Sequence, residues 1–202
     1  MTFADSIGRS NRAMMVLAAF AVLAIVAGFV WLRLEFRTFT NPSDGTAPTA
    51  PEDSFMVAKI TRDVSRGDVV YFLLPRDGRT IYIKRLVGMP GDRVRLDAGV
   101  LSINGVEVSH RVVGKALDQG KPVTLIEEQL PGGARYRTFD QGPDHDGDTT
   151  DEYIVPAGQY FMLGDNRDNS LDSRWPPEYG VGFVPAKNLL GKMVWPTDGR
   201  SP

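Results

Sequence analysis

YIKRLVGMPGD, residues Tyr82 to Asp92, reads as a β-strand that ends in a Pro-Gly turn, and it carries the first candidate for chemistry. Side chains alternate between the two faces of a strand, so Lys84 shares one face with the apolar Tyr82 and Leu86. Burial without a counter-charge lowers the pKa of a lysine, and the neutral amine is a general base that can take a proton from a serine hydroxyl. Lys84 is therefore a candidate base. The alternative is a lysine that reaches solvent at the edge of a strand.

Short β-rich runs continue on both sides of this strand. They occupy residues 55–60, 68–74, 80–87, 93–96, 100–103, 106–113, 122–127, 135–139, 153–155 and 160–163. Turn signals separate them, and the clearest is Asn104-Gly105, because these residue types readily adopt the positive φ values of a two-residue hairpin turn. The pattern predicts a mostly β fold, with one antiparallel β domain.

GDNRDNSLDSR, residues 164–174, follows the apolar run 160–163 and is rich in carboxylates, arginines and hydroxyls. Its composition alone is typical of a turn-rich surface loop. It is also suited to a closed hydrogen-bond network, in which Arg174 pairs with a carboxylate and hydroxyls orient a neighbouring amine.

The composition excludes several classes of function. The chain has no cysteine, a formal net charge of -2 and a pI near 5.7, which argues against disulfides, zinc-thiolate sites and nucleic-acid binding. The acidic stretch 141–152 does not fit an EF-hand, because Gly147 falls between its second and third acids, Asp146 and Asp148. We expect this stretch to be a solvated loop, and we expect neither a metal site nor a cofactor.

The N-terminal region carries a run of uncharged residues, Ala13 to Leu32, between Arg12 and Arg33. A helix of this length spans about 30 Å, the thickness of the hydrocarbon layer, so we expect a transmembrane anchor. Arg9 and Arg12 favour a cytoplasmic tail. A cleaved signal peptide is the alternative, but the run is longer than a usual h-region and no small-x-small site follows it closely. The predicted division is a cytoplasmic tail at 1–12, an anchor at 13–34 and a β domain at 35–202.

NPSDGTAPTAPE, residues 41–52, is dense in Pro, Gly, Ser and Thr and shows no periodic pattern. The composition indicates a linker between membrane and domain. An active-site loop is the competing interpretation.

The stretches 82–92 and 164–174 together resemble type I signal peptidases, which are membrane-bound Ser/Lys endopeptidases. The resemblance extends from about Pro42 to the C-terminus and includes RGDVVYF at 66–72 and GFVP at 182–185. It implies a signal peptidase-like β domain on the periplasmic or extracellular side of a bacterial-type inner or plasma membrane. The implied partners are the lipid bilayer and the signal peptides of exported preproteins.

The resemblance also implies roles for individual residues. Lys84 corresponds to the general base, in a largely apolar pocket, and Ser170 to a serine that hydrogen-bonds this lysine. Asp172 and Arg174 correspond to a supporting ion pair.

The segment that carries the nucleophile departs from the family. The family pattern P-S-x-S-M-x-P-T-L aligns with residues 42–50, which puts Gly45 at the nucleophile position. Ser43, which matches a serine that helps to hold the oxyanion, and Thr46 are the nearest hydroxyls, and either would need a shift of the loop. A displacement of about 1 Å can cost about a hundredfold in rate, and loss of the nucleophile costs on the order of a millionfold.

Two hypotheses follow. The first is a signal peptidase I homologue, a serine-type endopeptidase that cleaves small-x-small sites with Lys84 as base and Ser43 or Thr46 as an atypical nucleophile. The second is a non-catalytic paralogue that binds signal peptides or partner proteins in the retained cleft. A generic membrane-tethered β adaptor would leave both motifs unexplained.

Overall fold

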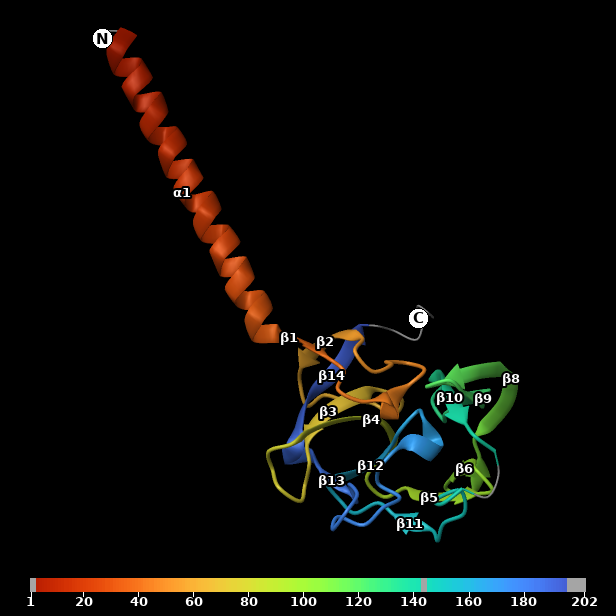
Figure 1. Cartoon of the computed structure of the whole chain (residues 1–202). Coiled ribbons are helices and arrows are strands. Elements are labelled where there is room, and N and C mark those ends of the chain that lie inside the picture. The colour runs from red at the N-terminus through yellow and green to blue at the C-terminus, as the bar shows by residue number, and fades with distance from the viewer. Residues whose placement is uncertain (1–2, 143–144, 196–202) are drawn as a thin grey trace. The chain divides into compact units, whose positions relative to one another are not determined.

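The computed structural model describes residues 3–142 and 145–195 (Figure 1). The chain divides into two compact units, Met1–Arg37 and Thr38–Pro202. The first unit is mainly one helix, and the second is a β domain.

Helix α1, Phe3–Glu35, contains 33 residues, and within it the segment Met14–Glu35 is long and apolar enough to cross a membrane. None of this segment is buried against described protein, and side chains such as Ile25 are largely exposed. The helix ends where the sequence changes to the β-branched and aromatic residues of strand β1. The apolar N-terminal helix predicted from the sequence is confirmed.

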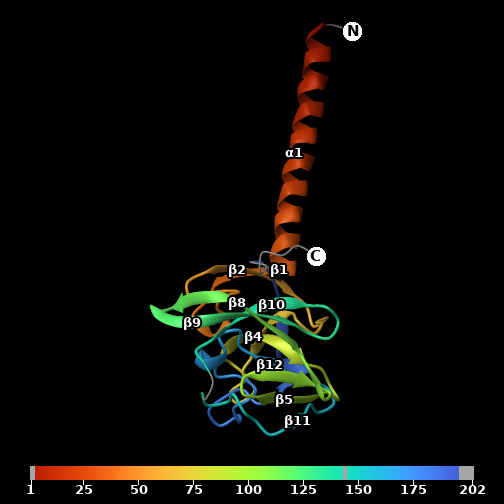
Figure 2. The ribbon, with the colours of Figure 1, turned by 90° about the vertical axis from the view of Figure 1, so that its right-hand side faces the viewer.

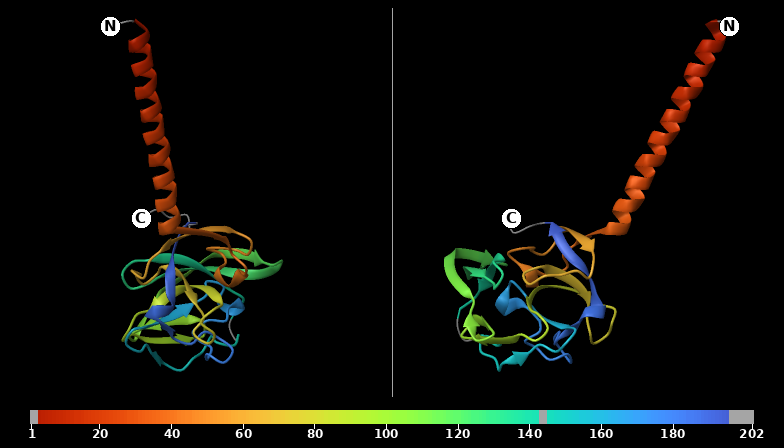
Figure 3. Two further views of the ribbon diagram at one scale, coloured as in Figure 1. Left: turned by 90° about the vertical axis from the view of Figure 1, so that its left-hand side faces the viewer. Right: turned by 180° about the vertical axis from the view of Figure 1, so that it is seen from behind.

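The β domain consists of three sheets with antiparallel pairing, as predicted (Figures 1 and 2). The strand orders are β1-β2-β14-β3-β4-β12-β13, β10-β9-β8 and β11-β5-β6-β7. Their bounds are β1 Phe36–Thr40, β2 Phe55–Ile60, β3 Val69–Leu73, β4 Ile81–Gly88, β5 Arg93–Asp97, β6 Val100–Ile103, β7 Val106–Glu107, β8 Ser109–Asp118, β9 Lys121–Gln129, β10 Arg135–Asp140, β11 Tyr153–Ile154, β12 Gln159–Leu163, β13 Val184–Pro185 and β14 Leu189–Trp195. Figure 3 shows the domain from two further sides.

The β-rich runs expected from the sequence correspond to β2 through β12, and the run at 106–113 falls on two strands, β7 and β8. Sequence analysis missed β1, β13 and β14. The largest omission is β14, which lies between β2 and β3 in the seven-stranded sheet. Gly191 interrupts its apolar run and weakens the strand signal. A glycine is needed there, because a Cβ would lie 2.1 Å from the Lys59 carbonyl oxygen.

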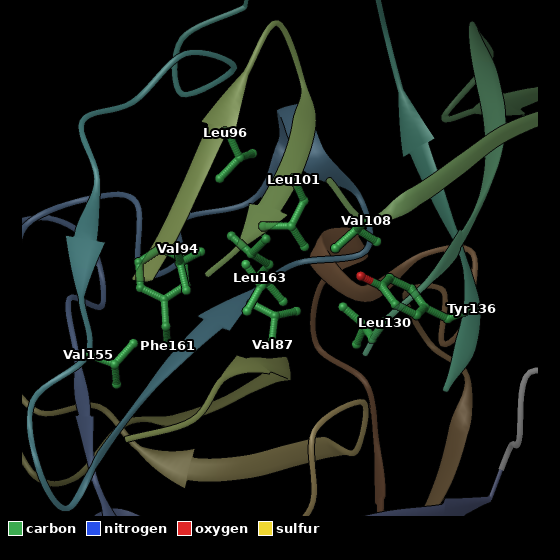
Figure 4. Packing of buried hydrophobic residues seen from close by; sticks show 11 residues of the cluster. Val87, Val94, Leu96, Leu101, Val108, Leu130, Tyr136, Val155, Phe161 and Leu163 are labelled. Carbon is green, nitrogen blue, oxygen red and sulfur yellow. The ribbon is translucent and has the colours of Figure 1, made fainter. Parts of the chain in front are cut away.

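Strand β4 lies between two hydrophobic clusters. Val87 belongs to the cluster of β5, β6 and β12 side chains, where Figure 4 shows it beside Leu163 and Leu101. Leu86 belongs to a second cluster, and Tyr82 packs against it. The two faces of β4 are therefore as predicted, and burial on both sides fixes the strand in the domain.

We expect Gly191→Ala to destabilise the protein. Its Cβ would also lie 2.3 Å from Tyr71 Cε1, so the backbone of β2 and a side chain of β3 would both have to move. Overpacking usually costs about 1–3 kcal/mol of unfolding free energy, and we expect the upper end of this range. Urea unfolding of the full-length protein in detergent micelles measures the effect.

Gly114→Ala in β8 is the matched control, because its φ is not positive and no described atom lies within 4 Å of the added Cβ. It should change the unfolding free energy by less than about 0.5 kcal/mol. Equal losses in the two variants would contradict the close packing of β14.

Candidate active site

The loop that follows β1 is compact, and the linker interpretation of residues 41–52 is wrong. Asn41, Thr46 and Ala50 are all buried. The Asn41 side-chain amide donates hydrogen bonds to Thr46 Oγ1 at 3.0 Å and to the Ala50 carbonyl oxygen at 2.5 Å. One buried asparagine thus closes the loop and fixes the short 3-10 turn η1, Asp44–Thr46, against the β domain.

Strand β4 brings Lys84 to Gly45. The Lys84 residue is only 5% exposed, and a Cβ on Gly45 would lie 2.5 Å from Lys84 Nζ. The amine therefore occupies the space that a side chain at position 45 would take. No described residue forms a hydrogen bond or an ion pair with this amine.

The pKa of Lys84 is lowered from 10.5 to about 8, mainly because burial disfavours the charged form. The carboxylates of Asp172 and Asp165 act in the opposite direction, and Arg174 adds to the lowering. The direction is the one predicted. At pH 7, however, a group with this pKa is still mostly protonated, so Lys84 is chiefly a cation.

The ion pair expected in the stretch 164–174 is present. Asp172 is fully buried, and its Oδ1 accepts a hydrogen bond of 2.9 Å from Arg174 Nε. Its Oδ2 accepts a hydrogen bond from the Gly164 amide at 3.0 Å. Burial acts to raise the pKa of Asp172, but Arg174, the Gly164 amide and Lys84 together hold it below its ordinary value.

The hydrogen bond expected between Ser170 and Lys84 is absent. Ser170 Oγ is buried and has no hydrogen-bond partner among the described residues. The hydroxyl lies against Gly164 instead, where an added Cβ would be 2.1 Å from it. Ser170 is therefore close to the site, but it leaves the amine unpartnered.

Sequence reasoning missed a second buried ion pair, formed by Arg85 and Asp165. Arg85 donates to Asp165 Oδ1 at 2.7 Å and to Oδ2 at 2.6 Å, and Thr49 donates to Oδ2 at 2.5 Å. The Arg85 guanidinium also lies over the Tyr136 ring, 4.0 Å from its centroid. The signal was available, because alternation puts Arg85 on the apolar face of β4, where a charge needs a partner.

A cleft of about 470 Å³ opens at Lys84. Residues 41–45 and 81–84 line it, together with Glu52, Thr80, Gln119, Asn169 and Leu171. Its lining is mixed, so the expectation of a largely apolar pocket is wrong. Strand β12 pairs with β4 only at Arg85, Leu86 and Gly88, so among the described strands nothing pairs with residues 81–84 on this side.

The two substitute hydroxyls differ in their surroundings. Thr46 Oγ1 accepts from Asn41 and donates to the Ala50 carbonyl oxygen at 3.1 Å, so its hydrogen bonds lie inside the loop. Ser43 is exposed and lines the same cleft as Lys84. Neither hydroxyl is hydrogen-bonded to Lys84 among the described residues.

The acidic stretch 141–152 is only partly solvated. Asp148 is buried, and its carboxylate accepts a hydrogen bond from the His145 amide at 2.9 Å, whereas Asp146 is exposed. Asp144 lies outside the described residues. In the part of the chain that the structure describes, no three His, Asp or Glu side chains gather in a metal-binding group.

The family model and the curated relatives that match this chain are signal peptidases. The family model described as "Signal peptidase, peptidase S26" matches residues 12–197. The signal peptidase I of Rickettsia conorii is 38% identical over 143 residues, which are 66% of this chain and 52% of that protein. The signal peptidase I of Rickettsia typhi is 39% identical over 143 residues, 66% of this chain and 53% of that protein. The chain spans about half the length of the curated relatives it matches.

A solved structure of a signal peptidase I from Enterococcus faecalis V583 is 28% identical and covers 64% of this chain and 96% of that chain. Its TM-score of 0.40 is too low to show a shared fold.

We expect Lys84→Met to change how stability depends on pH. The pKa of Lys84 is about 8 in the folded protein and 10.5 as the ordinary value, so between these pH values the unfolded chain binds the proton more strongly. The free energy of unfolding of the wild type should therefore rise with pH across this window, by about 3 kcal/mol from this group. Lys84→Met should lack this rise and be more stable at pH 7.

Urea unfolding of both proteins between pH 7 and pH 10.5, in detergent micelles, measures the difference. The other titrating groups are the same in both proteins, so their contributions cancel in the comparison. Lys59→Met is the control, because Lys59 is exposed on β2. Parallel pH profiles for the wild type and Lys84→Met would contradict a buried, unpartnered ammonium.

Proposed function

Because the chain belongs to the family of signal peptidases, peptidase S26, we propose that it is a membrane-anchored protein that binds signal peptides of exported preproteins without cleaving them. One observation carries the proposal: the Lys84 amine lies where a side chain at position 45 would be, and Gly45 has no hydroxyl to activate. A base without a nucleophile cannot form the covalent intermediate of a Ser/Lys hydrolase.

The cleft suits an extended peptide. Residues 81–84 of β4 have no strand partner among the described strands on the side of the cleft, and a peptide can add to such an edge as a further strand. The loop 41–45 forms another part of the lining. These features support retained peptide binding in the absence of cleavage.

The proposed topology follows the sequence. Residues 1–12 form a cytoplasmic tail, 13–34 an anchor and 35–202 the β domain on the periplasmic or extracellular side of a bacterial-type membrane. The length and apolar composition of Met14–Glu35 support a single span.

A second candidate is an active peptidase in which Ser43 is the nucleophile. The exposure of Ser43 and its place in the lining of the Lys84 cleft favour it over Thr46. This candidate is less well supported, because Ser43 lies two residues before the nucleophile position of the family, and catalysis tolerates little displacement of the nucleophile.

Gly45→Ser should raise cleavage of a precursor that carries an Ala-x-Ala site, whereas the wild type should show negligible cleavage. Gly45 does not have a positive φ, and the atom closest to an added Cβ is the movable end of Lys84, so serine can be accommodated. Adding Lys84→Ala should reduce the gain by about 10²–10⁴-fold, the usual contribution of a general base. Gel analysis of the processed precursor is the measurement.

Gly45→Ala is the matched control, because it adds the Cβ without the hydroxyl and should give no gain. Robust cleavage by the wild type that is lost in Ser43→Ala or Thr46→Ala would overturn the proposal and identify the nucleophile.

The anchor can be tested separately. The full-length protein should stay in the membrane fraction after high-salt and alkaline washing, because a spanning helix is not released by either treatment. Deletion of residues 1–34 should release most of the protein. Complete release of the full-length protein by alkali would exclude a span.

A further inference from the structure

The buried charges around Lys84 do not balance. Asp172 pairs with Arg174, and Asp165 pairs with Arg85, so both carboxylates that act on Lys84 already have an arginine partner. Lys84 adds one more positive charge to these two pairs. Lys84 is only 5% exposed, its amine has no described hydrogen-bond or ion-pair partner, and the residue lines the cleft.

A buried ammonium without a partner is costly, and an anion brought by a ligand would remove that cost. We propose that the cleft prefers peptides that end in a free carboxylate, and that Lys84 binds this carboxylate. Signal peptides already released by an active peptidase have such an end. This inference rests on the proposed function, since it names the form of the signal peptide that the same cleft binds.

The geometry suits a chain end at Lys84. The unpartnered edge of β4 runs from Ile81 to Lys84, so a peptide that adds to this edge can end at the amine. Lys84 lines the cleft, and its amine lies against Gly45, 2.5 Å from where a Cβ would be, so the amine can meet a ligand in the cleft. A side chain at position 45 would displace the amine, because it needs the space that the amine occupies.

The acidic side chains of the cleft do not supply the anion that Lys84 lacks. Asp44 accepts hydrogen bonds from the Glu52 amide at 2.7 Å and from the Gln119 side chain. Glu52 is exposed, and Asp44 is only partly buried, so solvent screens their charges more than it screens the charge of Lys84. An intact precursor presents only a neutral amide at this point, which cannot neutralise the ammonium.

The test compares three fluorescent peptides that share one signal sequence ending in Ala-x-Ala. The first has a free C-terminal carboxylate, the second a C-terminal amide, and the third continues as in the uncleaved precursor. Fluorescence anisotropy with the full-length protein in detergent micelles gives each Kd. We expect the carboxylate peptide to bind about ten- to a hundredfold more tightly than the other two, the range of a charge-assisted hydrogen bond.

Three variants test whether the Lys84 amine causes the preference for the carboxylate peptide. Lys84→Met should bind all three peptides equally, whereas Lys59→Met, which removes an exposed lysine outside the cleft, should keep the preference. Gly45→Ala retains the lysine but displaces its amine, since the new Cβ would lie 2.5 Å from Nζ, and it should weaken the preference.

The outcomes separate the two proposals. Equal binding of all three peptides to the wild type would leave the proposed function standing and overturn this inference. A preference that persists in Lys84→Met would also overturn it. Absence of binding by every peptide would count against the proposed function itself.

Discussion

The buried ion pair between Arg85 and Asp165 is the interaction on which the arrangement of the site depends. It joins three segments that are distant in sequence: strand β4, the stretch 164–174 and, through Thr49, the loop after β1. Breaking a buried pair by removing one partner typically costs about 3–5 kcal/mol, because the other charge stays buried. Since Lys84 precedes Arg85 on the strand, the pair also sets where the Lys84 amine lies relative to Gly45.

Close backbone approach completes the site. The Gly45 carbonyl oxygen accepts a hydrogen bond from the Asn166 amide at 3.4 Å, and a Cβ on Gly164 would lie 2.6 Å from that oxygen. A side chain at position 164 would therefore separate the loop after β1 from the stretch 164–174. Close packing of glycine backbone thus brings the loop after β1, the stretch 164–174 and Lys84 together around Gly45.

The protonation state of Lys84 determines which chemistry its amine can carry out. A lysine that serves as a base must lose its proton, and burial moves its pKa in that direction. Without a hydroxyl at position 45, the same burial leaves a charged amine against Gly45 in the lining of the cleft. In our proposal, the side chain at position 45 decides whether this amine transfers a proton or binds an anion.

The sequence by itself determined the apolar helix, most strands of the β domain and the inward direction of Lys84, because alternation and turn chemistry are encoded in windows of a few residues. It also located the motif that contains Asp172 and Arg174. Only the tertiary structure decided that β14 lies between β2 and β3, that the loop after β1 is buried and that neither Ser170 nor any other described residue is hydrogen-bonded to the Lys84 amine. The place of β14 and the burial of the loop depend on contacts between residues more than a hundred positions apart, such as Gly191 with Ile60 and Thr49 with Asp165, and no local pattern encodes such contacts.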